Sequence, residues 1–396
     1  MYPRIFSFIT TTCLLLALVH AQACPAIPDL TSYNNTALPD PFTFANGNKV
    51  VTLEDWACRR AEISTLMQMD ELGVLPDDPD LTVASFTGNT LTINVTDGGK
   101  SISFAPTITF PSGRAPAAGW PAIIGMGGIS IPRPSSVAII NFNNEQMANQ
   151  DSNPASRGVG LFFNLYGSDA SAGAMIAWAW AVRRIMDALE MTPSAKINTA
   201  RVGVSGCSRN GKGALVAGAF EPRLALTIPQ ESGSGGTDSW RISDFILASG
   251  ILTQTASELH TENVWMSPNF DAFATTSVNR LPFDHHLLGA MVAPRALFVI
   301  DNLGYDWLGP FSSFGAMVAA RTLWTAMGAS DSMGISQAAN HTHCVFPSTQ
   351  QPLLTAFINK FLLDQEGDTG VVETAGNYTF EVPDAQWAPW SVPSFV

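Results

Sequence analysis

The chain has 396 residues, of which 46% are hydrophobic and 13% charged, and its formal net charge is −13. This length allows one large α/β domain or two ordinary domains, with a full hydrophobic core. The negative charge, with no basic stripe to offset it, argues against a nucleic-acid partner.

Residues 1–23 have the features of a signal peptide. Arg4 provides a positive charge, residues 6–19 are mostly apolar and uncharged, and Ala21-Gln22-Ala23 is a small-residue cleavage site. The apolar stretch is too short to span a bilayer of ~30 Å. We therefore expect a secreted, extracellular protein with no membrane partner, whose mature part, residues 24–396, is a single catalytic domain.

Cysteine usage supports export. Four cysteines follow the expected cleavage site, an even number that suits an oxidising compartment. Four cysteines allow three pairings, and we expect Cys24–Cys58, which would tie down the N-terminus, and Cys207–Cys344.

Three sequons predict glycosylation of the exported surface, at Asn34, Asn94 and Asn377. A fourth sequon, at Asn340, lies beside a candidate active site and is left out of this prediction. The pattern is compatible with secretion.

Strand and helix signals alternate after an antiparallel start. Residues 81–110 alternate polar and apolar side chains between Gly-Asn and Asp-Gly-Gly turns, which predicts an antiparallel hairpin. Buried strands are then predicted at 121–125, 201–204, 224–228 and 295–300, and helices at 170–190, 209–219, within 311–327 and at 349–364. This alternation indicates an α/β three-layer sandwich with a mostly parallel central sheet and an antiparallel N-terminal portion.

The main chemical signal is the turn Gly206-Cys207-Ser208-Arg209-Asn210-Gly211. A strand is expected to end here, the chain to turn sharply at Ser208, and a helix of small residues to begin. Such an elbow exposes the serine oxygen at a helix N-terminus, where backbone N–H groups can stabilise an oxyanion. The match to G-x-S-x-G is imperfect, because Asn210 is at the fifth position. A phosphate-binding loop is the alternative, but the spacing fits neither the P-loop nor the dinucleotide fingerprint.

The base of such a site follows the last strand and precedes the last helix. Both His341 and His343 lie in that segment. If Cys207 pairs with Cys344, their Cα atoms are ~5.5 Å apart, and the adjacent residues Ser208 and His343 come close together, as an Oγ-to-imidazole hydrogen bond requires. His341 is two residues further away and is expected to be structural.

The adjacent histidines His285 and His286 could hold a metal or belong to a packed loop. A metal site needs further ligands at suitable spacing, and no third ligand accompanies them. We therefore expect a packed loop and no metal.

Two carboxylates at strand ends are candidates for the acid that orients the base. Glu231 follows the strand after the nucleophile helix, and Asp301 ends the next central strand. Asp301 is where most enzymes with this arrangement keep their acid, so the pattern alone favours Asp301.

Three sequence blocks resemble the glucuronoyl esterases, carbohydrate esterase family 15, which have the α/β-hydrolase fold. The blocks are residues 206–214, residues 229–236 and His343-Cys344. The resemblance implies that Ser208 is the nucleophile, Glu231 the acid and His343 the base, with Arg209 helping to stabilise the oxyanion. It also implies the disulfide between Cys207 and Cys344.

The resemblance further implies four sugar-binding residues, Lys212, Gln254, Glu262 and Trp307. Lys212 lies one helical turn after Ser208 and so points toward the same side. Glutamine and glutamate can hydrogen-bond sugar hydroxyls, and a tryptophan ring offers an apolar face to a pyranose.

The implied function is that of a carboxylic ester hydrolase, a serine esterase that needs no cofactor. Its substrate would be the lignin–carbohydrate ester between (4-O-methyl-)D-glucuronic acid of glucuronoxylan and lignin alcohols, and we expect a monomer. One alternative is an acetyl or feruloyl esterase of wall polysaccharides, in which the sugar supplies the alcohol instead of the acyl group. The other is a non-catalytic wall-binding protein on the same fold, which would predict loss of Ser208 or His343.

Overall fold

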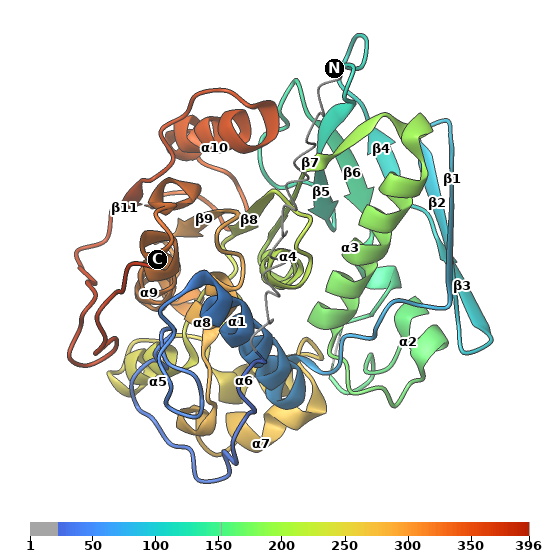
Figure 1. The fold of residues 1–396 in the computed structure, drawn as a ribbon. Helices are drawn as coiled ribbons and strands as arrows, with labels where there is room; N and C mark the ends of the chain where they lie inside the picture. The colour runs from blue at the N-terminus through green and yellow to red at the C-terminus, as the bar shows by residue number, and fades with distance from the viewer. Residues whose placement is uncertain (1–22, 152, 396) are drawn as a thin grey trace, which may run out of the picture.

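One mixed sheet of eleven strands organises residues 23–151 and 153–395, the part of the chain that the computed structural model describes (Figure 1). The expected signal peptide lies outside the described residues, apart from Ala23. The strands are β1 (Leu81–Thr87), β2 (Thr90–Asp97), β3 (Lys100–Phe104), β4 (Thr107–Thr109), β5 (Trp120–Met126), β6 (Ala138–Phe142), β7 (Ile197–Cys207), β8 (Leu226–Gln230), β9 (Ala296–Asn302), β10 (Met333–Ala338) and β11 (Val372–Thr374). The α-helices are α1 (Leu53–Met67), α2 (Leu161–Tyr166), α3 (Ala174–Met191), α4 (Arg209–Phe220), α5 (Trp240–Ala248), α6 (Ala256–Glu262), α7 (Asp271–Ala274), α8 (His285–Ala290), α9 (Pro310–Ala326) and α10 (Gln351–Leu363).

The sheet has an antiparallel part and a parallel part. Its strand order is β1-β2-β4-β6-β5-β7-β8-β9-β10-β11, with β3 also paired to β2. Pairs among β1, β2, β3, β4 and β6 are antiparallel, and every pair from β6–β5 to β10–β11 is parallel. The expected fold class is confirmed. Residues 81–110 are antiparallel as expected, with tight turns between β1 and β2 and between β2 and β3, and they form four short strands.

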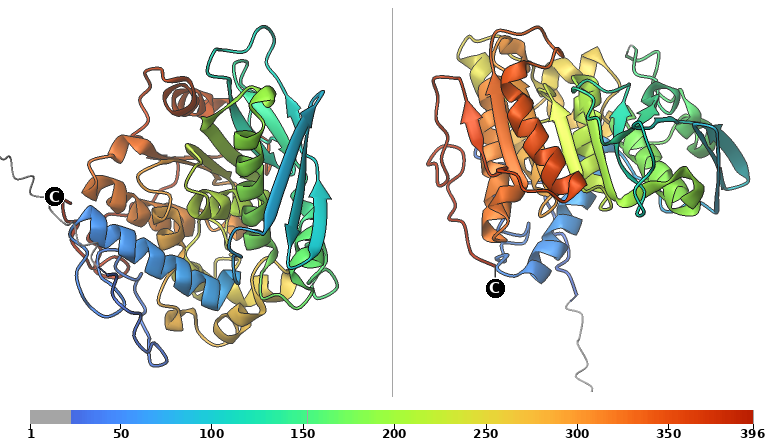
Figure 2. Two further views of the ribbon diagram at one scale, coloured as in Figure 1. Left: turned by 45° about the vertical axis from the view of Figure 1, so that its right-hand side comes forward. Right: turned by 90° about the horizontal axis from the view of Figure 1, so that it is seen from above.

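Helices cover both faces of the parallel part (Figure 2). Side chains alternate along a strand, so Ile123 joins the apolar layer of α10, which contains Phe357, while Ile124 joins the layer of α3, which contains Trp178. Phe298 of β9 stacks on Phe357 with ring centroids 4.5 Å apart. A sheet buried on both sides explains the continuous apolar strands in the sequence.

The N-terminal segment is held by α1. Thr52 and Asp55 form a reciprocal capping box at the start of this helix, which satisfies backbone donors of its first turn. The disulfide Cys24–Cys58, expected from the sequence, joins the segment to the helix.

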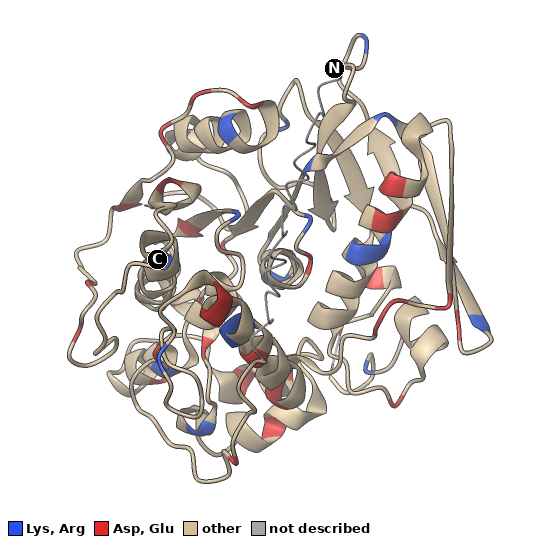
Figure 3. Cartoon of the chain, viewed as in Figure 1, with Lys and Arg blue, Asp and Glu red and all other residues tan. Residues whose placement is uncertain are grey.

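The described surface carries the sequon asparagines and a mixture of basic and acidic side chains. Asn34, Asn94 and Asn377 are exposed, as is Asn340. Lysine and arginine are dispersed over many elements and interleaved with acidic residues (Figure 3). Among the described residues, the helices are all too short or too polar to cross a membrane.

Candidate active site

The nucleophile turn connects β7 to α4 through Ser208, whose backbone φ is 58°. This left-handed conformation is uncommon for a residue with a side chain, and it redirects the chain sharply from strand to helix. The N–H of Ser208 donates to the carbonyl of Gln230 (3.0 Å), and its half-exposed side chain does not cap α4. Small neighbours are required, because a Cβ atom at Gly206 would lie 2.4 Å from the carbonyl oxygen of Asn210. The turn therefore leaves the hydroxyl of Ser208 free at the start of a helix.

A disulfide joins the end of β7 to the loop that follows β10. Cys207 and Cys344 are bonded, with their Cα atoms 5.7 Å apart, and this is the pairing expected from the sequence. A nitrogen of His343 lies within 4.8 Å of the Cys207 sulfur. Ser208 follows Cys207 and His343 precedes Cys344 in the chain. The disulfide therefore links the two segments that carry Ser208 and His343.

The imidazole of His343 contacts Glu231, the residue that follows β8. Its Nδ1 lies 2.8 Å from Oε2 of Glu231, and its Nε2 is buried without a hydrogen-bond partner among the described residues. An ionised carboxylate can only accept, so Nδ1 is the donor, and in the neutral imidazole Nε2 then has a free lone pair. This arrangement leaves Nε2 able to take a proton from a neighbouring hydroxyl.

The carboxylate of Glu231 is fully buried and has several donors around it. Oε2 also accepts from the backbone N–H of Cys344 (3.0 Å) and from Nδ2 of Asn302 (3.2 Å), and Oε1 accepts from Nε2 of Gln230 (3.1 Å). Burial alone would raise the pKa of Glu231, but the hydrogen bonds from His343, Cys344, Gln230 and Asn302 outweigh it and hold this pKa below its ordinary value. Glu231 is therefore ionised and fixed in place.

Asp301, the competing candidate, faces a different part of the protein. Its carboxylate accepts from the N–H of Asn302 (2.9 Å) and from Nε2 of Gln337 (3.1 Å). Burial raises the pKa of Asp301 to about 6. Of the two strand-end carboxylates, only Glu231 contacts His343 among the described residues.

His341, which was expected to be structural, also lies near Glu231. Its Nδ1 is 3.8 Å from Oε1 of Glu231, and Nδ2 of Asn302 contacts both this ring nitrogen (3.3 Å) and the carbonyl of His341 (3.2 Å). Asn302 thus joins His341 to the carboxylate that holds His343.

Lys212 is buried beneath the candidate site. Its Nζ donates to the carbonyls of Ser232 (2.5 Å) and Ser234 (2.6 Å), which leaves one of its three N–H donors. Burial lowers the pKa of Lys212 to about 8, against the opposing charges of Asp238 and Glu262. Lys212 therefore braces the loop after β8.

The other three expected sugar-binding residues lie on two adjoining segments. Nε2 of Gln254 donates to Oε2 of Glu262 (2.7 Å), and the backbone N–H of Gln254 donates to the carbonyl of Trp307 (3.2 Å). The Trp307 ring lies 5.1 Å from that of His343, at an interplanar angle of 76°. These contacts connect Gln254, Glu262 and Trp307 to the imidazole.

Tyr305 is a site residue that the sequence did not reveal. Its hydroxyl accepts a hydrogen bond from the backbone N–H of His343 (3.3 Å), and the two rings lie 6.0 Å apart. The only feature of the sequence that could have indicated Tyr305 is its position two residues before Trp307.

Arg209 is exposed and connects to a buried polar cluster that the sequence also did not reveal. One guanidinium nitrogen lies 3.4 Å from Oε1 of Gln150, which accepts the indole N–H of Trp265 (2.7 Å), and Nε2 of Gln150 donates to Glu145 (2.6 Å). The Trp265 ring also lies 5.2 Å from Nζ of Lys212. No local sequence signal marks Gln150, because it joins the cluster only through the fold.

His285 and His286 are buried at the start of α8, and not in the loop that the sequence indicated. Nδ1 and Nε2 of His285 contact the carbonyl of Gly236 and Oε1 of Glu71, both at 2.6 Å. Nε2 of His286 contacts the carbonyl of Pro39 (2.8 Å). These bonds give both histidines a packing role.

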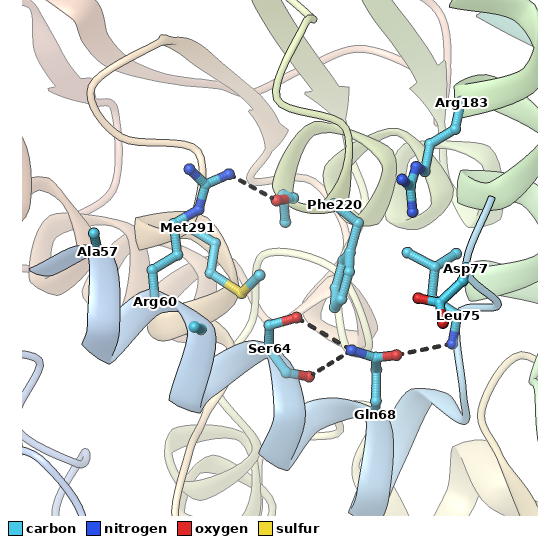
Figure 4. Close-up of a pocket in the computed structure, with 11 residues that line it drawn as sticks. Ala57, Arg60, Ser64, Gln68, Leu75, Asp77, Arg183, Phe220 and Met291 are labelled. Carbon is cyan, nitrogen blue, oxygen red and sulfur yellow. Dashed lines mark hydrogen bonds between the residues drawn. The ribbon is translucent and has the colours of Figure 1, made fainter. Parts of the chain in front are cut away.

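A cavity of about 450 Å³ lies beside α1, away from the nucleophile turn (Figure 4). Two of its polar side chains are paired: Arg60 donates to the carbonyl of Ala219, and Gln68 donates to Ser64. Ala219 belongs to the last turn of α4, about 16 Å along the helix from Ser208. The cavity therefore forms no part of the candidate active site.

Comparisons with known proteins all point to one family. Residues 93–328 match the family described as "Glucuronyl esterase, fungi". The chain is 54% identical over 373 residues to the 4-O-methyl-glucuronoyl methylesterase of Hypocrea jecorina, an alignment that covers 94% of this chain and 79% of that protein. The solved glucuronoyl esterase catalytic domain from Hypocrea jecorina has a TM-score of 0.88 and 54% identity, covering 92% of this chain and 98% of that one. A mutant glucuronoyl esterase from Sporotrichum thermophile, in complex with methyl 4-O-methyl-β-D-glucopyranuronate, has a TM-score of 0.89 and 47% identity, covering 95% of this chain and 100% of that one.

Proposed function

Because the chain belongs to the fungal glucuronyl esterase family and is a carboxylic ester hydrolase, we propose that it is a secreted enzyme acting on lignin–carbohydrate esters. The bond cleaved would join (4-O-methyl-)D-glucuronic acid of glucuronoxylan to an alcohol of lignin. The methyl glucuronate bound by the Sporotrichum thermophile relative supports a uronate on the acyl side. The features of residues 1–23 and the two disulfides support secretion.

The proposed catalytic residues are Ser208 as nucleophile, His343 as base and Glu231 as acid. The observation that carries this assignment is the 2.8 Å contact between Nδ1 of His343 and the buried carboxylate of Glu231, with Nε2 left unpaired. A carboxylate in this position holds the imidazole in one tautomer and stabilises the imidazolium that forms during the reaction.

The reaction proceeds through an acyl-enzyme. The Oγ of Ser208 attacks the C6 carbonyl carbon of the uronate while Nε2 of His343 takes the hydroxyl proton, and a tetrahedral oxyanion forms. The oxyanion collapses, the bond to the alcohol oxygen breaks, and His343 gives its proton to the departing alcohol. A water molecule, deprotonated by His343, then attacks the acyl-enzyme, and the uronic acid leaves as Ser208 regains its proton.

Two groups near Ser208 are suited to stabilise the oxyanion. The first N–H groups of α4 lack intrahelical partners, and the Arg209 side chain adds a positive charge at the same end. Binding of the sugar is assigned to Lys212, Gln254, Glu262 and Trp307, which would hold the acyl part of the substrate. The active form is proposed to be a monomer that needs no cofactor.

The main rival is an esterase that removes acetyl or feruloyl groups from wall polysaccharides. Release of acid from benzyl glucuronate, compared with release of acetate from acetylated xylan and ferulate from feruloylated arabinoxylan, separates the two. We expect rapid cleavage of benzyl glucuronate, abolished in Ser208→Ala. Cleavage of acetyl or feruloyl esters with benzyl glucuronate left intact would overturn the proposal.

A further inference from the structure

An apolar pocket of about 390 Å³ adjoins the segments that carry Gln254 and Trp307. Its walls are mainly hydrophobic and aromatic, with Phe245, Ile246, Ile251, Pro310, Phe311 and Tyr378 among the lining residues. None of these residues has a role in the proposed reaction. The pocket is therefore a separate feature that needs its own explanation.

Four apolar side chains in or next to this pocket are exposed. Phe245 is 47% exposed and Ile251 51% exposed, and the neighbouring Leu247 and Leu252 are 42% and 70% exposed. Scattered exposed apolar residues are common, but a contiguous group around a hollow is typical of a binding surface. Exposed apolar side chains of this kind lower the solubility of a protein unless a ligand or partner covers them.

Two hydrogen bonds join the walls of the pocket to the positions of candidate sugar-binding residues. The hydroxyl of Thr253 donates to the carbonyl of Asp306 (2.8 Å), and the next residue, Gln254, donates its N–H to the carbonyl of Trp307 (3.2 Å). Thr253 and Asp306 line the pocket, whereas Gln254 and Trp307 belong to the candidate sugar site. One pair of hydrogen-bonded segments therefore carries residues of both the pocket and the candidate sugar site.

The chemistry of the lining selects a neutral aromatic ring. Phe311 and Tyr378 meet edge to face at 5.3 Å, and the Tyr378 hydroxyl is bonded to Gln337 (2.5 Å), so its ring and not its polar end is offered to the pocket. The carboxylate-bearing Asp306 in the lining disfavours an anion such as a free uronate. The same residue, together with the hydroxyl of Thr253, can hydrogen-bond a phenolic group.

We propose that this pocket is a second subsite that binds a methoxyphenol-type ring of lignin while the uronate ester occupies the candidate active site. The inference rests on the proposed function, because only a lignin-linked ester brings such rings to this part of the surface. The subsite would hold the enzyme on insoluble lignin–carbohydrate material and would be idle with a small soluble ester.

The test compares Ile251→Glu with the matched control Val83→Glu. Val83 is 49% exposed on β1, which lies on the opposite side of the molecule from α5 (Figure 1), so both variants gain one charge at an equally exposed apolar position. Ile251→Ser is the milder second variant, which removes apolar contact without adding charge. Each is assayed on benzyl glucuronate and on an insoluble lignin–carbohydrate preparation, and the Ser208→Ala form of each is tested for depletion by milled lignin and by delignified glucuronoxylan.

We expect all variants to cleave benzyl glucuronate like the wild type. Ile251→Glu should lose about 5- to 10-fold in binding to lignin and in activity on the insoluble substrate, with a smaller loss for Ile251→Ser and none for Val83→Glu. Undiminished lignin binding by both Ile251 variants would overturn the proposal, as would an equal loss of binding to delignified xylan. A wild-type dimer that Ile251→Glu converts to a monomer would assign the pocket to self-association instead. Failure of the wild type on benzyl glucuronate would refute the proposed function, a result distinct from these.

Discussion

The backbone N–H of Cys344 donates a 3.0 Å hydrogen bond to Oε2 of Glu231, the same oxygen that contacts Nδ1 of His343. Since Cys344 is also bonded to Cys207, the loop carrying the imidazole is attached to two strands, β7 by a covalent bond and β8 by hydrogen bonds. This linkage fixes the relative positions of the three proposed catalytic residues before any substrate binds.

Replacing the carboxylate of Glu231 should lower kcat far more than replacing that of Asp301. Glu231→Gln should lower kcat by several orders of magnitude, with ~10⁴-fold as the serine-protease precedent, because the neutral amide no longer fixes the tautomer or stabilises the imidazolium. Asp301→Asn should cost much less, because Asp301 does not contact the imidazole. Steady-state kinetics on benzyl glucuronate measure both. Reversed losses would make Asp301 the acid, and a double variant that is dead while each single variant loses less than about tenfold would mean a shared role.

Ser208→Ala should abolish turnover and leave the fold intact. The expected loss approaches the ~10⁶-fold seen when a serine nucleophile is removed, while binding of glucuronate by calorimetry and the thermal midpoint should change little. Residual activity above about a hundredth of the wild-type rate would exclude Ser208 as the nucleophile.

The disulfide Cys207–Cys344 should support both stability and kcat, whereas Cys24–Cys58 should support stability alone. Cys207→Ala with Cys344→Ala should reduce both stability, by about 2–5 kcal/mol, and kcat, because the loop of His343 loses its covalent anchor. Cys24→Ala with Cys58→Ala is the control, which should lower the thermal midpoint with kcat retained. Non-reducing peptide mapping of the secreted protein should recover both pairs. A free thiol at Cys207 or Cys344, or equal kinetic losses in the two double variants, would count against this role.

Glu262 should act on substrate binding more than on chemistry. Glu262→Gln should raise KM for benzyl glucuronate about 5- to 10-fold with kcat nearly unchanged, the signature of lost binding energy shared by ground and transition states. Glu258→Gln, one turn earlier on the same helix, removes the same charge and should leave KM unaltered. Equal changes in the two variants would point to a general charge effect.

The stability of the protein should carry a pH signature from Asp301. Burial raises its pKa from 3.8 to about 6, so the folded state holds the proton more tightly than the unfolded chain, and stability falls as the pH rises between these values. Asp301→Asn removes this dependence. Its unfolding free energy relative to the wild type should therefore rise by up to about 3 kcal/mol between about pH 4 and pH 7. Denaturant unfolding at several pH values measures this difference in unfolding free energy. A difference that does not change with pH would contradict the raised pKa of Asp301.

The local sequence pattern was sufficient to predict the fold class, but it did not predict every strand. The helix ending at Phe220 and the strand ending at Asn302 were readable because small or apolar runs are bounded by clear turns. The strand at Ala138–Phe142 and the strand at Met333–Ala338 were missed. Five or six residues carry too little periodicity to distinguish a buried strand from a loop, and only pairing with β5 and β9 completes them.

The sequence by itself determined the nucleophile turn at Ser208, because only small residues allow the strand and helix to approach so closely there. It also placed two histidines and a cysteine together before the last helix. Which carboxylate meets the imidazole was decided by the tertiary structure, since Glu231 and Asp301 both end strands at the same edge of a parallel sheet. The path of the loop after β10, held by the disulfide to Cys207, brings His343 to Glu231 and leaves Asp301 facing Gln337. The disulfide and the contact between His343 and Glu231 join residues more than a hundred positions apart, and no local pattern encodes them.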